Sequence, residues 1–235
     1  MRIPEIEKGF RTRLINNTKK KKILNRRFPH FSDKNCHYLD ALWSSLLYYR
    51  PKYCLEIGTH DGMNSTRVFS EYLSQYQSDG VLVTLDIVPC TSTLPSNVKQ
   101  VIVFPHHSRI EKTCGGDGKW FTETNLLTGF SEKFEVSTLQ NIEKIKDKMM
   151  SLGIEKFDLA FIDGDHERES FLKDVQICEN LLKDPKIMII DDTKEEIHPC
   201  CHVYFDEIKM SEKYETYDFD DWNRFVGMSI VTKLG

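Results

Sequence analysis

The chain has 235 residues, with 32 lysines and arginines against 36 aspartates and glutamates, so its formal net charge is −4. This length suits one α/β domain with a substantial core, and the balanced charge argues against the whole molecule as a nucleic-acid binder. No apolar run approaches the ~20 residues of a membrane span, and the start of the chain lacks a signal-peptide core. The seven cysteines show no paired C-x-x-C spacing, so we expect free thiols and a cytoplasmic location.

The first part of the chain is expected to be a basic arm followed by a helix. Nine lysines and arginines and no acid lie between Lys8 and Arg27, which favours a solvated helix face or a mobile arm over a site for RNA or anionic lipid. Apolar residues recur with helical period over 38–47, and Pro51 ends that segment. We expect this helix to pack against the sheet edge or to cover a cofactor, with Trp43 in the core.

A strand, a turn and a helix follow. Residues 53–57 form a buried strand that ends at Gly58, residues 59–62 form a short turn, and Asn64 or Ser65 can cap a helix. Glycine lets the backbone approach a ligand, and a helix N-terminus offers unpaired N–H groups. Because open α/β sheets bind ligands at the carboxyl ends of their strands, this corner predicts a ligand site.

The second strand, residues 80–86, ends in a carboxylate. Asp86 stands about twenty residues beyond the glycine turn, a position suited to accepting both hydroxyls of a ribose. A nicotinamide cofactor would use such an acid equally well. The turn sequence GTHDG lacks the G-x-G-x-x-G spacing that brings a pyrophosphate onto the helix, and so argues against a dinucleotide.

A third strand is expected at 98–104, with His106, His107 and Ser108 at its exit. The two histidines suggest a metal, but neighbours in an extended segment point to opposite sides, which disfavours a shared ion. Residues 109–135 show no sustained period, and a long irregular segment in a compact domain is commonly a lid or substrate loop. We therefore expect 105–135 to be such a loop.

Two more buried strands are expected to end in acids. Residues 156–163 end at Asp163, and residues 187–192 end at Asp191 and Asp192. Parallel strands deliver their carboxyl ends to the same edge of a sheet, so the three acids are expected to converge. Gathered carboxylates repel one another unless a positive charge lies between them, and Mg²⁺ or a similar hard cation suits oxygen ligands.

The remaining segments complete an alternating α/β pattern. Helices are expected at 136–152, 164–183 and 203–213, and final strands at 214–219 and 225–233. The loop before the third of these helices holds two histidines and two cysteines, but adjacent cysteines do not readily share a zinc ion. We expect contacts with a substrate there.

Four segments, in this order and spacing, carry a family resemblance: EIGTHDGMNST at 56–66, VLVTLDI at 81–87, FDLAFIDGDHERE at 157–169 and IMIIDDT at 187–193. Together they resemble the signature segments of class I S-adenosylmethionine-dependent methyltransferases, in the branch with an EIGTxxGxST first motif and an IDGDH fourth strand. The resemblance implies an α/β fold with a Rossmann-like, seven-stranded, mainly parallel sheet, an antiparallel last strand and helices on both faces. This domain would span 51–235, after an N-terminal extension at 1–50.

The resemblance also implies the positions of the cofactor and of a metal. The residues indicated for S-adenosylmethionine are Glu56, Gly58, Thr59, His60, Asp61, Ser65, Asp86, Ser108 and Asp163. Metal-dependent O-methyltransferases acting on catechols and sugar hydroxyls have an acid ending the fourth strand, a basic residue three positions later and an acid pair ending the fifth. Asp163, His166 and the pair Asp191 and Asp192 match that spacing. It implies Mg²⁺ held by the three acids, with His166 as base and Asp163 as its catalytic neighbour.

We therefore expect methyl transfer to a hydroxyl of a small metabolite or glycan sugar, assisted by a divalent cation while His166 takes the proton. The alternatives are an N-methyltransferase acting on an amine, an RNA-directed methyltransferase served by the basic arm, and a binding protein without turnover. Without a metal, Asp163 would contact only the cofactor, and Asp165 would cap the next helix. Assembly as a homo-oligomer is left open.

Overall fold

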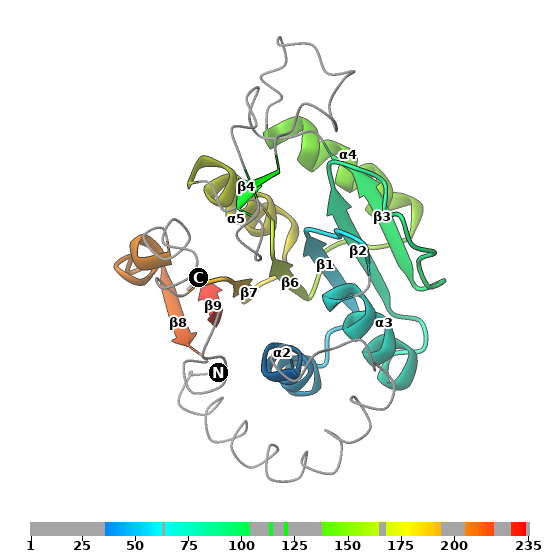
Figure 1. The fold of residues 1–235 in the computed structure, drawn as a ribbon, viewed down its shortest axis with the longest axis horizontal. Coiled ribbons are helices and arrows are strands. Elements are labelled where there is room, and N and C mark those ends of the chain that lie inside the picture. The colour runs from blue at the N-terminus through cyan, green and yellow to red at the C-terminus, as the bar shows by residue number, and fades with distance from the viewer. Residues whose placement is uncertain are drawn as a thin grey trace.

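The chain folds around one seven-stranded sheet (Figure 1). The computed structural model describes residues 36–62, 64–103, 113–114, 120–121, 138–164, 168–193, 205–218 and 227–233. The strands of the large sheet are β1 (Tyr53–Ile57), β2 (Val81–Asp86), β3 (Val98–Ile102), β6 (Leu159–Ile162), β7 (Lys186–Asp191), β8 (Tyr214–Asp218) and β9 (Met228–Lys233). They lie in the order β3-β2-β1-β6-β7-β9-β8. Within this sheet β9 runs opposite to the other six strands, so its pairings with β7 and β8 are antiparallel, as predicted for the last strand.

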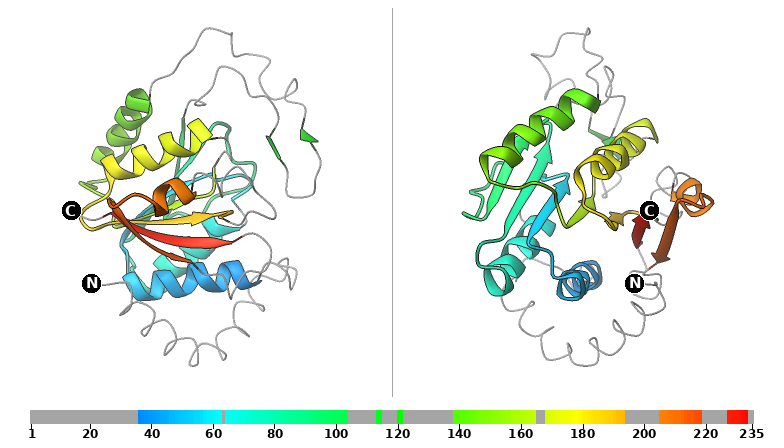
Figure 2. Two further views of the ribbon diagram at one scale, coloured as in Figure 1. Left: turned by 90° about the vertical axis from the view of Figure 1, so that its left-hand side faces the viewer. Right: turned by 180° about the vertical axis from the view of Figure 1, so that it is seen from behind.

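Helices cover both faces of the sheet (Figure 2). The helices are α2 (Cys36–Tyr49), α3 (Ser65–Tyr76), α4 (Thr138–Ser151) and α5 (Arg168–Leu181). The helices α2 and α3 lie on one face, and α4 and α5 on the other. Because α3 connects β1 to β2 and α5 connects β6 to β7, each crossover brings the next strand back in parallel, with its carboxyl end at the same edge of the sheet.

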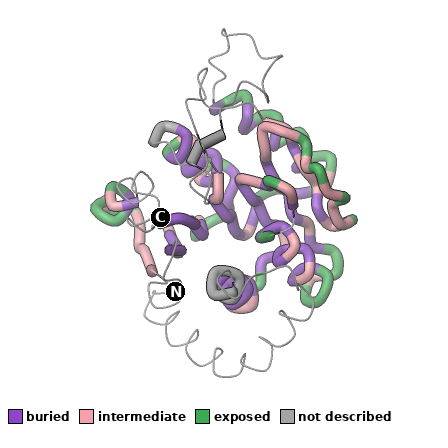
Figure 3. Tube along the Cα trace, viewed as in Figure 1, coloured by how far each residue is buried: buried purple, intermediate pink, exposed green. Residues whose placement is uncertain are grey.

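Apolar side chains alternate between two cores. In β1, Leu55 and Ile57 pack toward α4 and α5, whereas Cys54 packs toward α2 and α3. Phe161 and Ile162 divide in the same way along β6. Figure 3 shows the central strands buried and β8 only partly so. Burial of both faces explains why the central strands are almost continuously apolar in sequence.

The helix α2 packs on a face of the sheet, beside α3, and not against the sheet edge that the sequence analysis allowed for. Trp43 is 5% exposed and meets the ring of Tyr72 edge-on, with ring centroids 6.2 Å apart. Its predicted place in the core is therefore confirmed. No helix in the described ranges is long and apolar enough to cross a membrane.

Three local expectations differ from the structure. Asn64 precedes α3 at the cap position, but its side chain makes no capping hydrogen bond, and Ser65 is already helical. The helix predicted over 203–213 is helical at 205–209, and turn residues lead from there into β8. Within the predicted irregular loop, β4 (Thr113–Cys114) pairs with β5 (Trp120–Phe121) in an antiparallel ladder. The rest of 105–135 lies outside the described residues.

A half-buried carboxylate ties the start of β1 to the neighbouring strand. Asp158 Oδ2 accepts hydrogen bonds from the backbone amides of Lys52 at 2.7 Å and Tyr53 at 2.8 Å, and Lys183 forms an ion pair with its other oxygen. Burial alone would raise the pKa of Asp158, but the bonds from Lys183 and the two amides lower it below its usual value. The carboxylate thus accepts hydrogen bonds from two half-buried backbone amides at the start of β1.

We predict that Asp158→Ala lowers the free energy of unfolding by about 2–3 kcal/mol at neutral pH, because backbone donors lose their acceptor. The pKa of Asp158 is lower in the folded state, so this stabilisation is present above the unfolded pKa of roughly 3.9 and is lost as the pH falls below it. Urea unfolding between pH 7 and pH 3 measures the effect.

The control is Asp79→Ala, which removes an exposed carboxylate paired with Lys52. Exposed ion pairs contribute about 0–1 kcal/mol. Equal losses in the two variants would contradict the role assigned to Asp158.

Candidate functional site

The glycine turn lies directly against the exit of β6. Gly58 has a φ of 94°, and its amide donates to the carbonyl of Leu85 at 2.9 Å. The amide of Asp163 donates to the carbonyl of Ile57 at 2.9 Å. A Cβ atom at position 58 would lie 1.9 Å from the carbonyl oxygen of Asp163, so only glycine fits. Two predicted site residues, Gly58 and Asp163, are therefore backbone neighbours.

Asp86 meets the same turn from the end of β2. Its Oδ2 accepts hydrogen bonds from the amides of Thr59 at 3.1 Å and His60 at 2.8 Å, and its Oδ1 accepts one from the amide of Val88 at 3.2 Å. These bonds accompany a φ of 48° at His60, a left-handed value that residues other than glycine rarely adopt. The structure thus brings Asp86 and the turn together, and the Asp86 side chain is half-buried.

The side chains of the turn divide between the interior and solvent. Thr59 is 3% exposed, and its Oγ1 lies 2.7 Å from Oγ1 of Thr84. Ser65 is also buried. The His60 side chain is 86% exposed, with Nδ1 3.6 Å from an oxygen of Asp61. Thr59 and Ser65 therefore support the turn from the protein interior, while the exposed side chain of His60 and the partly exposed side chain of Asp61 can contact a ligand from the solvent side.

Glu56 is fully buried on the face of β1 that carries α3. Its Oε2 accepts a hydrogen bond from the hydroxyl of Thr66 at 2.7 Å. Burial raises the pKa of this carboxyl to about 7, and the neighbouring hydroxyl groups lower it only in part. Glu56 thus contacts the start of α3 and Thr84 of β2, so this acid supports the turn from the interior of the domain.

The ends of β6 and β7 bring the three predicted acids into one electrostatic group. Asp163 follows β6, Asp191 is the last residue of β7, and Asp192 follows with a φ of 58°. Burial raises the pKa of Asp163 well above its usual range, and the charges of Asp192 and Glu56 raise it further. Burial also raises the pKa of Asp191 well above its usual range, and the charges of Asp192 and Asp163 raise it further. The charge of Asp192 therefore acts on both Asp163 and Asp191, as expected for carboxylates at neighbouring strand ends.

Asp191 and Asp192 are nearly inaccessible, at 9% and 8% exposed. Among the described residues, no three His, Cys, Asp or Glu side chains are arranged as a metal-binding group. Ser108, His166 and the histidines at 106 and 107 lie outside the described residues, as does the loop after Thr193. The charges of these acids act on one another, but their convergence as a ligand set for a metal stays a prediction.

The sequence analysis missed two hydroxyl residues that shape the corner. Thr66 holds Glu56, and Thr84 faces Thr59 from within β2. Thr84 had a visible signal, since it is the one hydroxyl residue in the otherwise apolar run VLVTL. Buried polar groups are nearly always hydrogen-bonded, so such a residue indicates a polar partner nearby. Thr66 lies inside the quoted first motif, but its partner became evident only from the fold.

Known proteins resemble this chain in sequence family and in fold. A family described as "Methyltransferase domain" matches residues 55–193. No curated protein matches the chain. Among solved structures, an O-methyltransferase from Bacillus cereus in complex with SAH has a TM-score of 0.52 at 14% identity, covering 97% of this chain and 91% of that one. TomG, an O-methyltransferase from Streptomyces achromogenes in complex with SAM, has a TM-score of 0.51 at 12% identity, covering 92% and 89%.

A Staphylococcus aureus protein assigned to the caffeoyl-CoA O-methyltransferases has a TM-score of 0.55 at 15% identity, covering 96% of this chain and 99% of that one. At these identities the likeness establishes the shared fold, including the predicted Rossmann-like sheet.

We predict that Glu56→Gln removes a pH dependence of stability. Because burial raises the folded-state pKa from 4.5 to about 7, the native state holds this proton more tightly than the unfolded state. The stabilisation is fully present below pH 4.5 and is lost as the pH rises to about 7, by about 3 kcal/mol. The wild type should therefore lose stability relative to Glu56→Gln across this window in denaturant titrations.

The matched control is Glu143→Gln on the exposed side of α4. Its stability should follow that of the wild type at every pH. A Glu56→Gln curve parallel to the wild-type curve would show that Glu56 ionises normally inside the fold.

Proposed function

Because the chain belongs to the methyltransferase domain family, we propose that it transfers the methyl group of S-adenosylmethionine to a hydroxyl of a small metabolite or a glycan sugar. The observation that carries this proposal is the meeting of the Gly58 turn, Asp86 and the Asp163 group at one edge of the sheet. Ligands of open α/β sheets bind at that edge. Residues 51–235 are proposed as the catalytic domain and 105–135 as its lid.

The cofactor is proposed to lie over the turn. Asp86 offers carboxylate oxygens to the ribose hydroxyls, and Gly58 keeps the backbone free of a side chain where the ligand approaches. Asp61, His60 and Ser108 are proposed as further contacts of the cofactor. SAH and SAM complexes of proteins with the same fold support this choice of cofactor. The positively charged sulfonium would also be favoured by the nearby acids Asp163 and Glu56.

The acceptor is proposed to lie beside the acids that follow β6 and β7. Transfer of a methyl group to a hydroxyl releases a proton, so the reaction needs a group that accepts it. His166 is assigned this role because an imidazole titrates near neutral pH. Asp163 would orient the acceptor oxygen next to the methyl group. Holding both reactants together can lower the barrier by up to roughly 7–11 kcal/mol in favourable cases.

A divalent cation such as Mg²⁺ is the remaining part of the proposal. The donor chemistry fits, because Asp163, Asp191 and Asp192 supply carboxylate oxygens and their mutual repulsion would be relieved by a cation. When bound, the cation would lower the pKa of an acceptor hydroxyl. The described residues do not complete a three-ligand group. The roles proposed for Asp86, His166 and Gly58 do not depend on a bound cation.

We predict that the wild-type protein binds S-adenosylmethionine in isothermal titration calorimetry, and that Asp86→Asn weakens this binding about 10- to 100-fold. Loss of charge-assisted hydrogen bonds to the ribose costs about 1.5–3 kcal/mol, and each 1.4 kcal/mol is tenfold in affinity. Asp184→Asn, which changes an exposed acid paired with Lys186, should bind as the wild type does. A wild type without any binding would refute the proposed function.

We further predict that Mg²⁺ gives a binding heat in the presence of S-adenosylmethionine and a catechol such as 3,4-dihydroxybenzoate. Asp163→Ala should lose this heat because a carboxylate ligand is removed. Methyl transfer followed by mass spectrometry should fall when EDTA is added. Cofactor binding with no Mg²⁺ heat and transfer resistant to EDTA would remove the cation and leave the His166 route; transfer to amines alone would replace O-methylation with N-methylation.

A further inference from the structure

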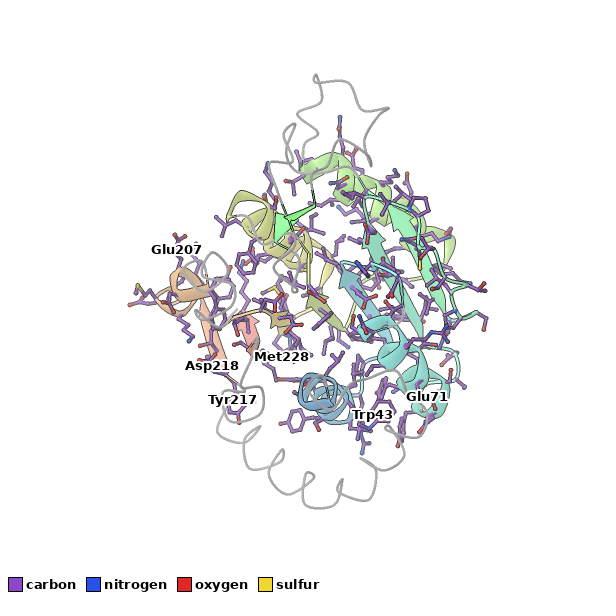
Figure 4. All side chains as sticks on the ribbon, viewed as in Figure 1. Trp43, Glu71, Glu207, Tyr217, Asp218 and Met228 are labelled. Atoms are coloured by element: carbon purple, nitrogen blue, oxygen red, sulfur yellow. The ribbon has the colours of Figure 1, made fainter. Side chains whose placement is uncertain are left out.

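A buried serine interrupts the apolar strand β9. Ser229 is 0% exposed and lies between Ile190 of β7 and Asp218 of β8 in the sheet register. Figure 4 labels Asp218 on β8 and Met228, the residue before Ser229, on β9. A serine at this depth costs free energy unless its hydroxyl is hydrogen-bonded. Its two hydrogen-bond partners therefore indicate what it does.

The hydroxyl of Ser229 connects two strands through a directed chain of hydrogen bonds. Ser229 Oγ donates to Asp218 Oδ1 at 2.8 Å, and it lies 3.0 Å from Oγ1 of Thr193. A hydroxyl has one proton, and that of Ser229 is used on the carboxylate, so Thr193 must donate to Ser229. The other oxygen of Asp218 pairs with Lys209 Nζ at 2.7 Å. This ion pair keeps the carboxylate available as the final acceptor.

The chain of hydrogen bonds ends at the bend that follows β7. Asp192 has a left-handed φ of 58°, and Thr193, the next residue, is 7% exposed. The amide of Thr193 also donates to the carbonyl of Gly227 at 3.4 Å. A non-glycine residue stays in this region when its surroundings hold it there, and such residues cluster at functional sites. Here the hydroxyl of Thr193, one residue after Asp192, holds the backbone at this bend through its hydrogen bond with Ser229.

We propose that Ser229 and Asp218 are positioning residues, which hold Thr193 and thereby fix the direction of the Asp192 carboxylate beside Asp163. Neither residue needs to touch the cofactor or the acceptor. They would act on the proposed acceptor position indirectly, through the backbone of Asp192 and Thr193 at the end of β7. The catalytic consequence rests on the proposed function, whereas the mechanical link between Ser229 and Thr193 does not.

The test compares Ser229→Ala with Ser229→Thr, which keeps a hydroxyl, and with Ser45→Ala. Ser45 is a matched control because it is also fully buried and hydrogen-bonded, to the carbonyl of Ala41 in α2. Amide hydrogen exchange is measured at Asp192 and Thr193 by NMR. The kcat and the KM for S-adenosylmethionine are measured with 3,4-dihydroxybenzoate as acceptor, and unfolding in urea gives the stability of each variant.

We expect Ser229→Ala to speed exchange at Asp192 and Thr193 at least tenfold and to lower kcat at least tenfold, with the KM for S-adenosylmethionine within twofold of wild type. Ser229→Thr should restore both values. Ser45→Ala should lose comparable stability without these local changes. If Ser229→Ala does not fold, Asp218→Asn replaces it, because an amide cannot keep the charged bond to Ser229 or the pair with Lys209.

Unchanged exchange at Asp192 and Thr193 would overturn the proposal. So would changes that follow global stability alone, as in Ser45→Ala. If the wild type binds S-adenosylmethionine but methylates no acceptor, the proposed O-methyl transfer fails, and the exchange measurement by itself decides whether Ser229 positions the end of β7.

Discussion

The contact between Gly58 and the backbone of Asp163 is the constraint on which the candidate site depends. With 1.9 Å between a would-be Cβ and the Asp163 carbonyl oxygen, the ends of β1 and β6 can approach only if position 58 has no side chain. That approach places the turn bound by Asp86 beside the acids of the two central strands. The turn that Asp86 holds and the end of β6 therefore meet through one backbone contact.

Electrostatic repulsion is the cost of this arrangement. Burial raises the pKa of Glu56, Asp163 and Asp191. The negative charges of neighbouring carboxylates raise each of these pKa values further. Replacing them with apolar residues would relieve the repulsion. A positively charged ligand placed beside these acids would relieve the repulsion as well.

The seven strands and the helices between the central ones were predictable, because buried parallel strands have apolar runs and end in recognisable glycine or acid residues. The positions of Gly58, Asp86 and Asp163 followed from the same pattern. The order of the strands in the sheet was not predicted and came from the structure. The sequence could not show that Asn64 leaves α3 without a side-chain cap, since capping depends on local geometry that many side chains satisfy equally. Nor could it connect Ser229 with Thr193, because their contact depends on the register of β9 against β7.

The position of β9 has a consequence for the order in which the protein can form. β9 lies between β7 and β8, yet it follows both in the chain. During synthesis on the ribosome, β7 is available before its neighbour on that side, and β8 emerges before the strand it pairs with. Both carry unpaired backbone groups until residues 228–233 have been made, and such exposed edges invite association with other chains. The sheet can therefore close only after translation has passed its last strand.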